Sequence, residues 1–99
     1  MKAIILLTRR DGDTPEGFRR WWLEEHAPLA RQLPGLRKLE FNLVEGDAPH
    51  DGVAELWFDS VADLEAAYTS EIGQRVAADS TAHLAARVRL VVAEHPQFG

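Results

Sequence analysis

The chain has 99 residues, of which 45% are hydrophobic and 27% charged, and its formal net charge is −5. These values are typical of one globular domain and exclude a disordered chain. The absence of cysteine excludes disulfides, thiolate zinc sites and thiol nucleophiles. An acidic balance without a basic cluster argues against nucleic acid as a partner.

Residues 2–9 (KAIILLTR) predict the first strand. The apolar run from Ala3 to Leu7 is far shorter than the roughly 20 residues of a membrane helix. It also lacks the length and cleavage site of a signal peptide. We therefore expect a cytoplasmic protein without membrane association. The strand is apolar on both faces, which predicts a central position in a sheet that is covered on both sides.

A helix is predicted to begin after Thr14, an N-cap residue, with Pro15 at the first helical position. Apolar residues and one histidine then form a single stripe at helical spacing. Its members are Phe18, Trp22, His26, Leu29 and Leu33. Pro28 lacks an N–H and clashes with the preceding turn, so the helix should kink or restart near His26.

Three further strands are predicted, at residues 36–44, 53–58 and 87–94. Ser60 should cap a second helix over residues 61–68, residues 72–78 predict further helix, and Asp79 or Ser80 is a candidate cap for another short one. The order βαββαβ predicts one α+β domain over residues 1–99 with the ferredoxin-like fold and both helices on one face of a four-stranded antiparallel sheet.

Alternation along the strands divides the sheet into two faces. The face expected under the helices carries Leu39, Phe41, Leu43, Ala54, Leu56, Phe58, Val88, Leu90 and Val92. The opposite face is expected to carry Lys38, Glu40, Asn42, Val44, Val53, Glu55, Trp57, Arg87, Arg89 and Val91. Two interpretations of this mixed face remain open: a solvated surface with one stray tryptophan, or a face that closes on a second copy across a two-fold axis.

The chain resembles the EthD family of the dimeric α+β barrel superfamily over nearly its whole length. The resemblance rests on Phe18, Trp22, His26 to Leu29, Leu33 to Leu36, Asn42, Asp51 to Phe58, Asp79 and Glu94, in that order. It implies a homodimer whose two sheets form a barrel, with a cleft for a small organic ligand between sheet and helices in each subunit. Where the family usually has a bulky aromatic, four residues after Asp79, this chain has His83.

His26 is the main catalytic candidate. A nearby helix C-terminus favours its cation and burial disfavours it, so its imidazole could titrate near neutral pH as a general acid or base. The alternative is a structural histidine that bonds a local carbonyl at the kink. The resemblance adds Asp79, which is expected to face His26, although a helix N-cap is its other role. His83 lies either in the cleft or on the surface.

The remaining candidates lie on the strands. Glu55 could orient an imidazole or accept a proton, and Asn42 could hold a substrate oxygen. An ion pair with Lys38, Arg87 or Arg89 is the alternative for Glu55. Arg89 suits a substrate carboxylate, and Trp57 could stack on a flat ligand or pack in the dimer.

Together these residues predict an enzyme that moves protons without a bound cofactor. Phe18, Trp22, His26 and Leu29 would line an apolar pocket, and His26 would act with Asp79 or Glu55. The reaction would be an isomerisation, cyclisation or oxygenation of a small aromatic or polyketide-like compound. Two alternatives stay open on the same scaffold: a small-molecule binding protein and a haem protein. The histidines show no close metal-ligand spacing, so we expect no metal site.

Overall fold

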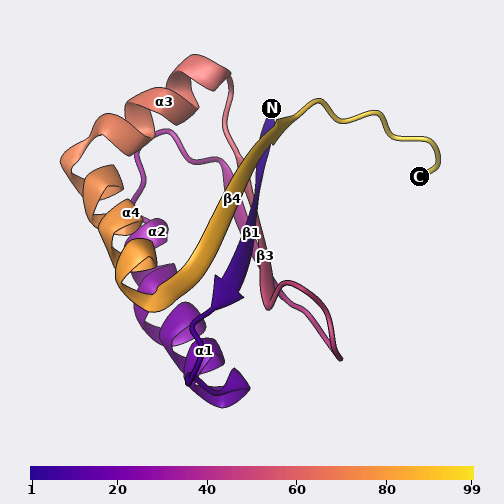
Figure 1. Cartoon of the computed structure of the whole chain (residues 1–99). Helices are drawn as coiled ribbons and strands as arrows, with labels where there is room; N and C mark the ends of the chain where they lie inside the picture. Colours follow the sequence, from indigo (N-terminus) through magenta and orange to yellow (C-terminus); the bar gives the residue numbers. More distant parts are fainter.

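A computed structural model describes all residues, Met1–Gly99, and its elements follow the order βαββαβ (Figure 1). The elements are β1 (Lys2–Arg9), α1 (Pro15–Arg20), the π-helical η1 (Trp21–His26), α2 (Ala27–Ala30), β2 (Lys38–Leu43), β3 (Gly52–Trp57), α3 (Val61–Thr69), α4 (Glu71–His83) and β4 (Leu84–Val92). The strands form one antiparallel sheet in the order β2-β3-β1-β4. The predicted ferredoxin-like α+β fold is therefore confirmed.

All helices lie on one side of the sheet, so the molecule has two layers, and its extents are 38 × 37 × 19 Å (Figure 1). The core fills the space between the layers. Its residues include Ala3, Ile5 and Leu7 from β1, Ala54 and Leu56 from β3, Phe18, Trp21 and Trp22 from the first helical region, and Leu64, Ala67 and Val76 from α3 and α4. As predicted, β1 is central, but only one of its two apolar faces is covered by this chain.

The uncovered face of the sheet bears many apolar side chains. The register with β1 places Ile4 opposite Leu90 and Leu6 opposite Val88, and residues that oppose each other in an antiparallel pair share a face. Val53 of β3 joins them through its pairing with Leu6. Val88 and Leu90 are each 44% exposed. These five residues are called the open-face patch below.

This register corrects the prediction for β4. Ile5 pairs with Arg89 and Leu7 pairs with Arg87, so both arginines lie on the helix side of the sheet. Val88, Leu90 and Val92, predicted to face the helices, lie on the open face instead. The physical reason is the edge position of β4, where an arginine stem packs over the helix layer while its guanidinium reaches the border of the sheet.

The first helical region begins as predicted, with the Thr14 side chain accepting from the Gly17 amide. The predicted irregularity near His26 takes the form of a π-helix, in which the Ala27 N–H donates to the carbonyl of Trp22, five residues back. A widened turn accommodates Pro28, which has no N–H to donate. It also shifts the buried stripe, so that Ala30 is buried where Leu29 was predicted.

The second helical region is longer than predicted. Ser70 ends α3 and its side chain caps α4 by accepting from the Gly73 amide. The α4 helix then runs without a break through Asp79 and Ser80, so the prediction that either residue caps a further helix is wrong. β4 follows directly at Leu84, three residues before its predicted start.

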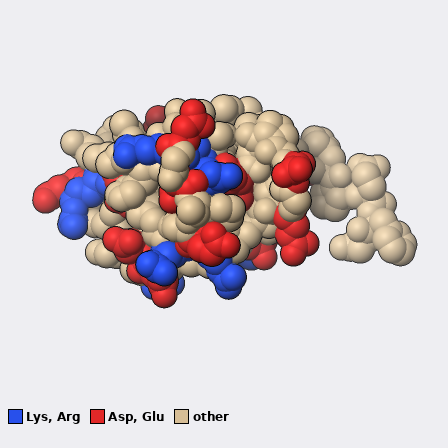
Figure 2. Space-filling model, turned by 60° about the horizontal axis from the view of Figure 1, so that its bottom comes forward, with Lys and Arg blue, Asp and Glu red and all other residues tan.

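Acidic and basic side chains alternate over the face shown in Figure 2, and no large area of one sign appears on it. Some of these charges pair, as Arg37 does with Asp59 at 2.7 Å. None of the helices has the length and apolar character that crossing a membrane requires. Beyond β4, residues 93–99 leave the sheet as an extended tail (Figure 1).

The α3–α4 corner yields a stability prediction. A Cβ atom at Gly73 would overlap the carbonyl oxygen of Ala67 and lie 2.6 Å from Cα of Tyr68. Backbone atoms cannot move aside as a side-chain end can, so Gly73→Ala should destabilise the fold by about 1–3 kcal/mol or more. Urea unfolding measures this, with the exposed helix substitution Arg75→Ala as the control. Equal stability of the two variants would contradict the close approach.

Candidate functional site

His26 is the centre of the polar contacts beneath the sheet. It ends η1, is only 5% exposed, and its Nδ1 lies 2.8 Å from Oδ2 of Asp79 in the middle of α4. A carboxylate only accepts hydrogen bonds, so Nδ1 carries the proton in the neutral imidazole. The other ring nitrogen, Nε2, is then left with a free lone pair. This is the tautomer that a general base needs.

Two more aromatic rings complete the surroundings of Asp79. The indole Nε1 of Trp21 donates to Oδ2 of Asp79 at 3.2 Å, and Nδ1 of His83 lies 3.3 Å from Oδ1. The Trp21 ring stacks on His83 at a centroid distance of 4.7 Å and lies tilted against His26 at 4.9 Å. These contacts fix the orientation of the carboxylate and, through it, that of the His26 ring.

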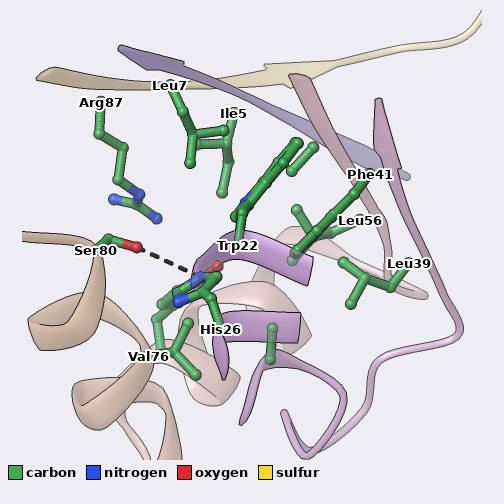
Figure 3. Close-up of a pocket in the computed structure, with 13 residues that line it drawn as sticks. Ile5, Leu7, Trp22, His26, Leu39, Phe41, Leu56, Val76, Ser80 and Arg87 are labelled. Carbon is green, nitrogen blue, oxygen red and sulfur yellow. Dashed lines mark hydrogen bonds between the residues drawn. The ribbon is translucent and has the colours of Figure 1, made fainter. Parts of the chain in front are cut away.

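On the other side of His26 lies a small cavity between the helices and the sheet (Figure 3). The Oγ of Ser80 lies in its wall, 3.5 Å from Nε2 of His26. The other lining residues are Ile5, Leu7, Trp22, Ala30, Leu39, Phe41, Ala54, Leu56, Tyr68, Val76 and Arg87. The volume of about 20 Å³ is enough for a water molecule and too small for a ring. Of the four residues predicted to line an apolar pocket, Trp22 and His26 line this cavity, whereas Phe18 and Leu29 do not.

Phe41 and Leu39 separate this cavity from a groove of about 470 Å³ on the outside, since both also line that groove. Both residues are partly buried and come from β2, the strand at the edge of the sheet. Movement of these two side chains would join the two spaces.

Burial and charge set the protonation of the site in opposite directions. Burial lowers the pKa of His26 below its usual 6.5, and the nearby Asp79 carboxylate opposes this only in part. Arg87 and His83 lower the His26 pKa further. Burial likewise raises the pKa of Tyr68, against the effect of Arg87. At neutral pH the cavity thus contains a neutral imidazole and a protonated phenol.

Comparison with known proteins agrees with this architecture. The EthD domain model matches residues 10–87, which is most of the chain. The chain belongs to the EthD family. The predicted resemblance is confirmed, and no curated protein matches in sequence.

Solved structures share the fold of this EthD domain at low sequence identity. An EthD family protein from Bacillus halodurans has 21% identity and a TM-score of 0.77, with 93% of this chain and 97% of that chain covered. A dimeric ferredoxin-like protein of unknown function from Thermobifida fusca has 21% identity and a TM-score of 0.72, covering 90% and 85%. A mutant of SnoaB, a cofactor-independent oxygenase from Streptomyces nogalater, has 15% identity and a TM-score of 0.67, covering 98% and 96%.

Several predicted site residues lie on the other side of the sheet from His26. Asn42, Glu55 and Trp57 share the open face, where Asn42 donates to Glu55 at 3.2 Å and Lys2 pairs with Glu55 at 3.1 Å. The Lys2 ammonium group lowers the pKa of Glu55, so this carboxylate is ionised at neutral pH. Within one chain the sheet stands between Glu55 and His26, so a role for Glu55 in assisting His26 stays a prediction.

Other predicted residues lie near the cavity without lining it. Phe18 is buried against Trp21 and Trp22. Ala30 lines the cavity, and Leu29 does not. Arg89 pairs with Glu65 at 3.1 Å on the helix side. The side chain of His83 is 44% exposed and covers the outer face of Trp21. Only Trp22 and His26 of the predicted site residues line the cavity itself.

The sequence interpretation missed Tyr68, Ser80 and Arg87, the three other polar residues of the wall. Tyr68 and Ser80 carried one available signal, because each lies at helical spacing from buried positions of α3 and α4. Arg87 was assigned to the wrong face with the rest of β4. Trp21, which lies off the predicted stripe, contacts α4 through Asp79.

The lowered pKa of His26 predicts a pH-dependent stability. Below about pH 6.5 the unfolded chain takes up a proton that the folded site resists, so stability should fall with pH from 6.5 down to the lowered pKa of His26. The slope from this residue is at most about 1.4 kcal/mol per pH unit. Urea unfolding of the wild type and of His26→Gln between pH 5 and 7.5 isolates it. Parallel pH profiles of the two proteins would contradict the burial of a neutral imidazole.

Proposed function

We propose that this EthD protein is an enzyme that moves a proton on a small aromatic or polyketide-like compound, with His26 as general base and Asp79 as the residue that orients it. The observation that carries the proposal is the Nδ1–Oδ2 contact of 2.8 Å, which leaves Nε2 unprotonated at the cavity. The reaction class is isomerisation, cyclisation or oxygenation without a bound cofactor. The similarity of the fold to that of SnoaB, a cofactor-independent oxygenase, supports this reaction class.

The chemistry follows from the two nitrogens of one ring. Nε2 accepts a proton from carbon next to a carbonyl group, and the imidazolium that forms is stabilised by the Asp79 carboxylate. Burial keeps the base neutral, and therefore competent, at neutral pH. The apolar wall excludes water, which strengthens each of these electrostatic contacts.

The proposal includes a homodimer in which two open faces meet. The open-face patch offers exposed valine and leucine, and polar groups gather at one end of the same face. There Trp57 donates to Glu94 at 2.7 Å, and the Lys38 ammonium lies 4.5 Å from the Trp57 ring. An apolar patch with paired charges at its side suits a self-complementary interface. In such a dimer, Glu55 and Asn42 would face the shared interior.

The same cavity would serve a binding protein without turnover, and the exchange assay below separates the two functions. A haem group does not fit the residues present. Nε2 of His26, the nitrogen free to bind iron, faces a space of about 20 Å³, which does not hold a porphyrin ring. A haem function therefore receives no support from this site.

The test of proton transfer needs no known substrate. Small aryl ketones in D₂O should lose α-protons faster in the presence of the protein, as followed by proton NMR. His26→Gln should reduce this catalysed exchange by about 10²–10⁴-fold, because the base is lost. Asp79→Asn should also reduce it, because an amide N–H that donates to Nδ1 leaves the ring proton on Nε2, the wrong tautomer for a base.

The matched control is His50→Gln, since His50 lies in a loop beside Thr8 and lines no part of the cavity. It should exchange ketone protons at the wild-type rate. Full activity in His26→Gln would refute the proposed role of this residue. Specific binding of ketones with no catalysed exchange in the wild type would identify a binding protein.

The dimer has its own prediction. Leu90→Glu would introduce a charge into the open-face patch and should convert the dimer to a monomer at micromolar concentration in analytical ultracentrifugation. Val61→Glu is the matched control, because Val61 is 49% exposed on α3 and lies outside the sheet. A wild type that sediments as a monomer, or a Leu90→Glu variant that remains dimeric, would contradict the sheet-face interface.

A further inference from the structure

Among the polar groups around the cavity, those that only donate hydrogen bonds outnumber those that only accept them. Arg87 and the Trp22 indole N–H only donate, whereas the Tyr68 and Ser80 hydroxyls donate or accept. In the neutral tautomer described above, Nε2 of His26 is the one group that only accepts. A ligand that satisfies this wall must therefore bring acceptor oxygens to Arg87 and to the Trp22 N–H.

The Trp22 N–H is the clearest sign of a missing partner. The Trp22 side chain is fully buried at 0% exposure, and its Nε1 has no hydrogen-bond partner in the protein. Figure 3 shows the ring as a wall of the cavity, with its nitrogen at the end nearer to Arg87 and Ser80. A buried donor without a partner is costly for the fold, by roughly 1–3 kcal/mol, so this N–H calls for an acceptor from outside the chain.

Arg87 is the second sign. Its guanidinium reaches from β4 towards Ser80 and His26 (Figure 3), and no carboxylate of the chain forms an ion pair with it. The neighbouring Arg89 is paired with Glu65, and the Asp79 carboxylate is engaged with His26, Trp21 and His83. A half-buried cation that has no anionic partner at a cavity is suited to an anionic ligand.

We infer that Arg87 and the Trp22 N–H form a binding site for an anionic oxygen group, so that the substrate is a carboxylate or a carbonyl compound that forms an enolate. The inference rests on the proposed function and names its substrate class. In the proton-transfer step the α-proton goes to Nε2 of His26, and the electron pair of the broken C–H bond moves to the carbonyl oxygen. Arg87 and Trp22 stabilise that oxyanion, and His26 returns the proton to carbon.

The test uses two pairs of probes that differ in charge but little in shape. Benzoate is compared with benzamide, and cyclohexane-1,3-dione, which ionises to an enolate near neutral pH, is compared with cyclohexanone. The readout is the ¹⁵N–¹H signal of the Trp22 indole, assigned with Trp22→Phe. At least one anion should shift this signal downfield and bind at least tenfold more tightly than its neutral counterpart. The pair with the larger preference identifies carboxylate or enolate as the natural group.

The variants assign that preference to a residue. Arg87→Gln should abolish the preference for the anion, and Arg89→Gln, two residues along the same strand and face, should keep it. Phe41→Ala opens the cavity wall, so each titration is repeated in that background to separate exclusion by size from lack of affinity. Equal binding of anionic and neutral probes, a preference retained in Arg87→Gln, or no shift of the Trp22 signal in either background would overturn the inference.

The outcome is separable from that of the proposed function. Ketone exchange that depends on His26, together with no Arg87-dependent anion binding, would remove the substrate assignment and leave the base in place. Anion binding that depends on Arg87, together with full exchange activity in His26→Gln, would remove the base and leave the anion site.

Discussion

The hydrogen bond between the buried His26 and Asp79 is the contact on which the rest of the site depends. It joins the end of η1 to the middle of α4, 53 residues away in sequence, and thus ties the two helical regions together beneath the sheet. A buried imidazole without this partner would lack both a fixed orientation and a fixed tautomer. With it, one nitrogen is used for structure and the other remains free.

The π-helical turn makes that contact possible. In the π-helix each N–H bonds to the carbonyl five residues back. This spacing brings Trp21 and His26 onto one side of the helix, where both contact the Asp79 carboxylate. The Ala27-Pro28 pair explains why the turn is tolerated, because an α-helix would require an amide N–H that Pro28 lacks. The interruption of this apolar helix at His26 therefore allows the side chains of His26 and Trp21 to contact Asp79 together.

The sheet separates two environments with different requirements. The helix side contains a cavity with a neutral base and unpaired donors, and chemistry there benefits from the exclusion of water. The open side carries an apolar patch beside the ion pairs of Lys2, Glu55 and Glu94. That mixture suits burial against a second chain better than exposure to solvent. Burial against a second chain would therefore strengthen the ion pairs on the open face. A bound ligand, by contrast, would provide the partner of Arg87.

The sequence by itself determined the order of the elements, the antiparallel ferredoxin-like fold, the Thr14 and Ser60 caps, and the irregular turn at His26, because periodicity, caps and proline act locally. It also singled out His26 and, through the family resemblance, Asp79. The tertiary structure alone decided which face of β4 is inward, since that depends on pairing of Ile5 with Arg89 across the sheet. It alone brought Tyr68, Ser80 and Arg87 to one cavity and put Glu55 on the far side of the sheet. Register and long-range contact are set by how whole layers pack, and no local pattern in the chain encodes them.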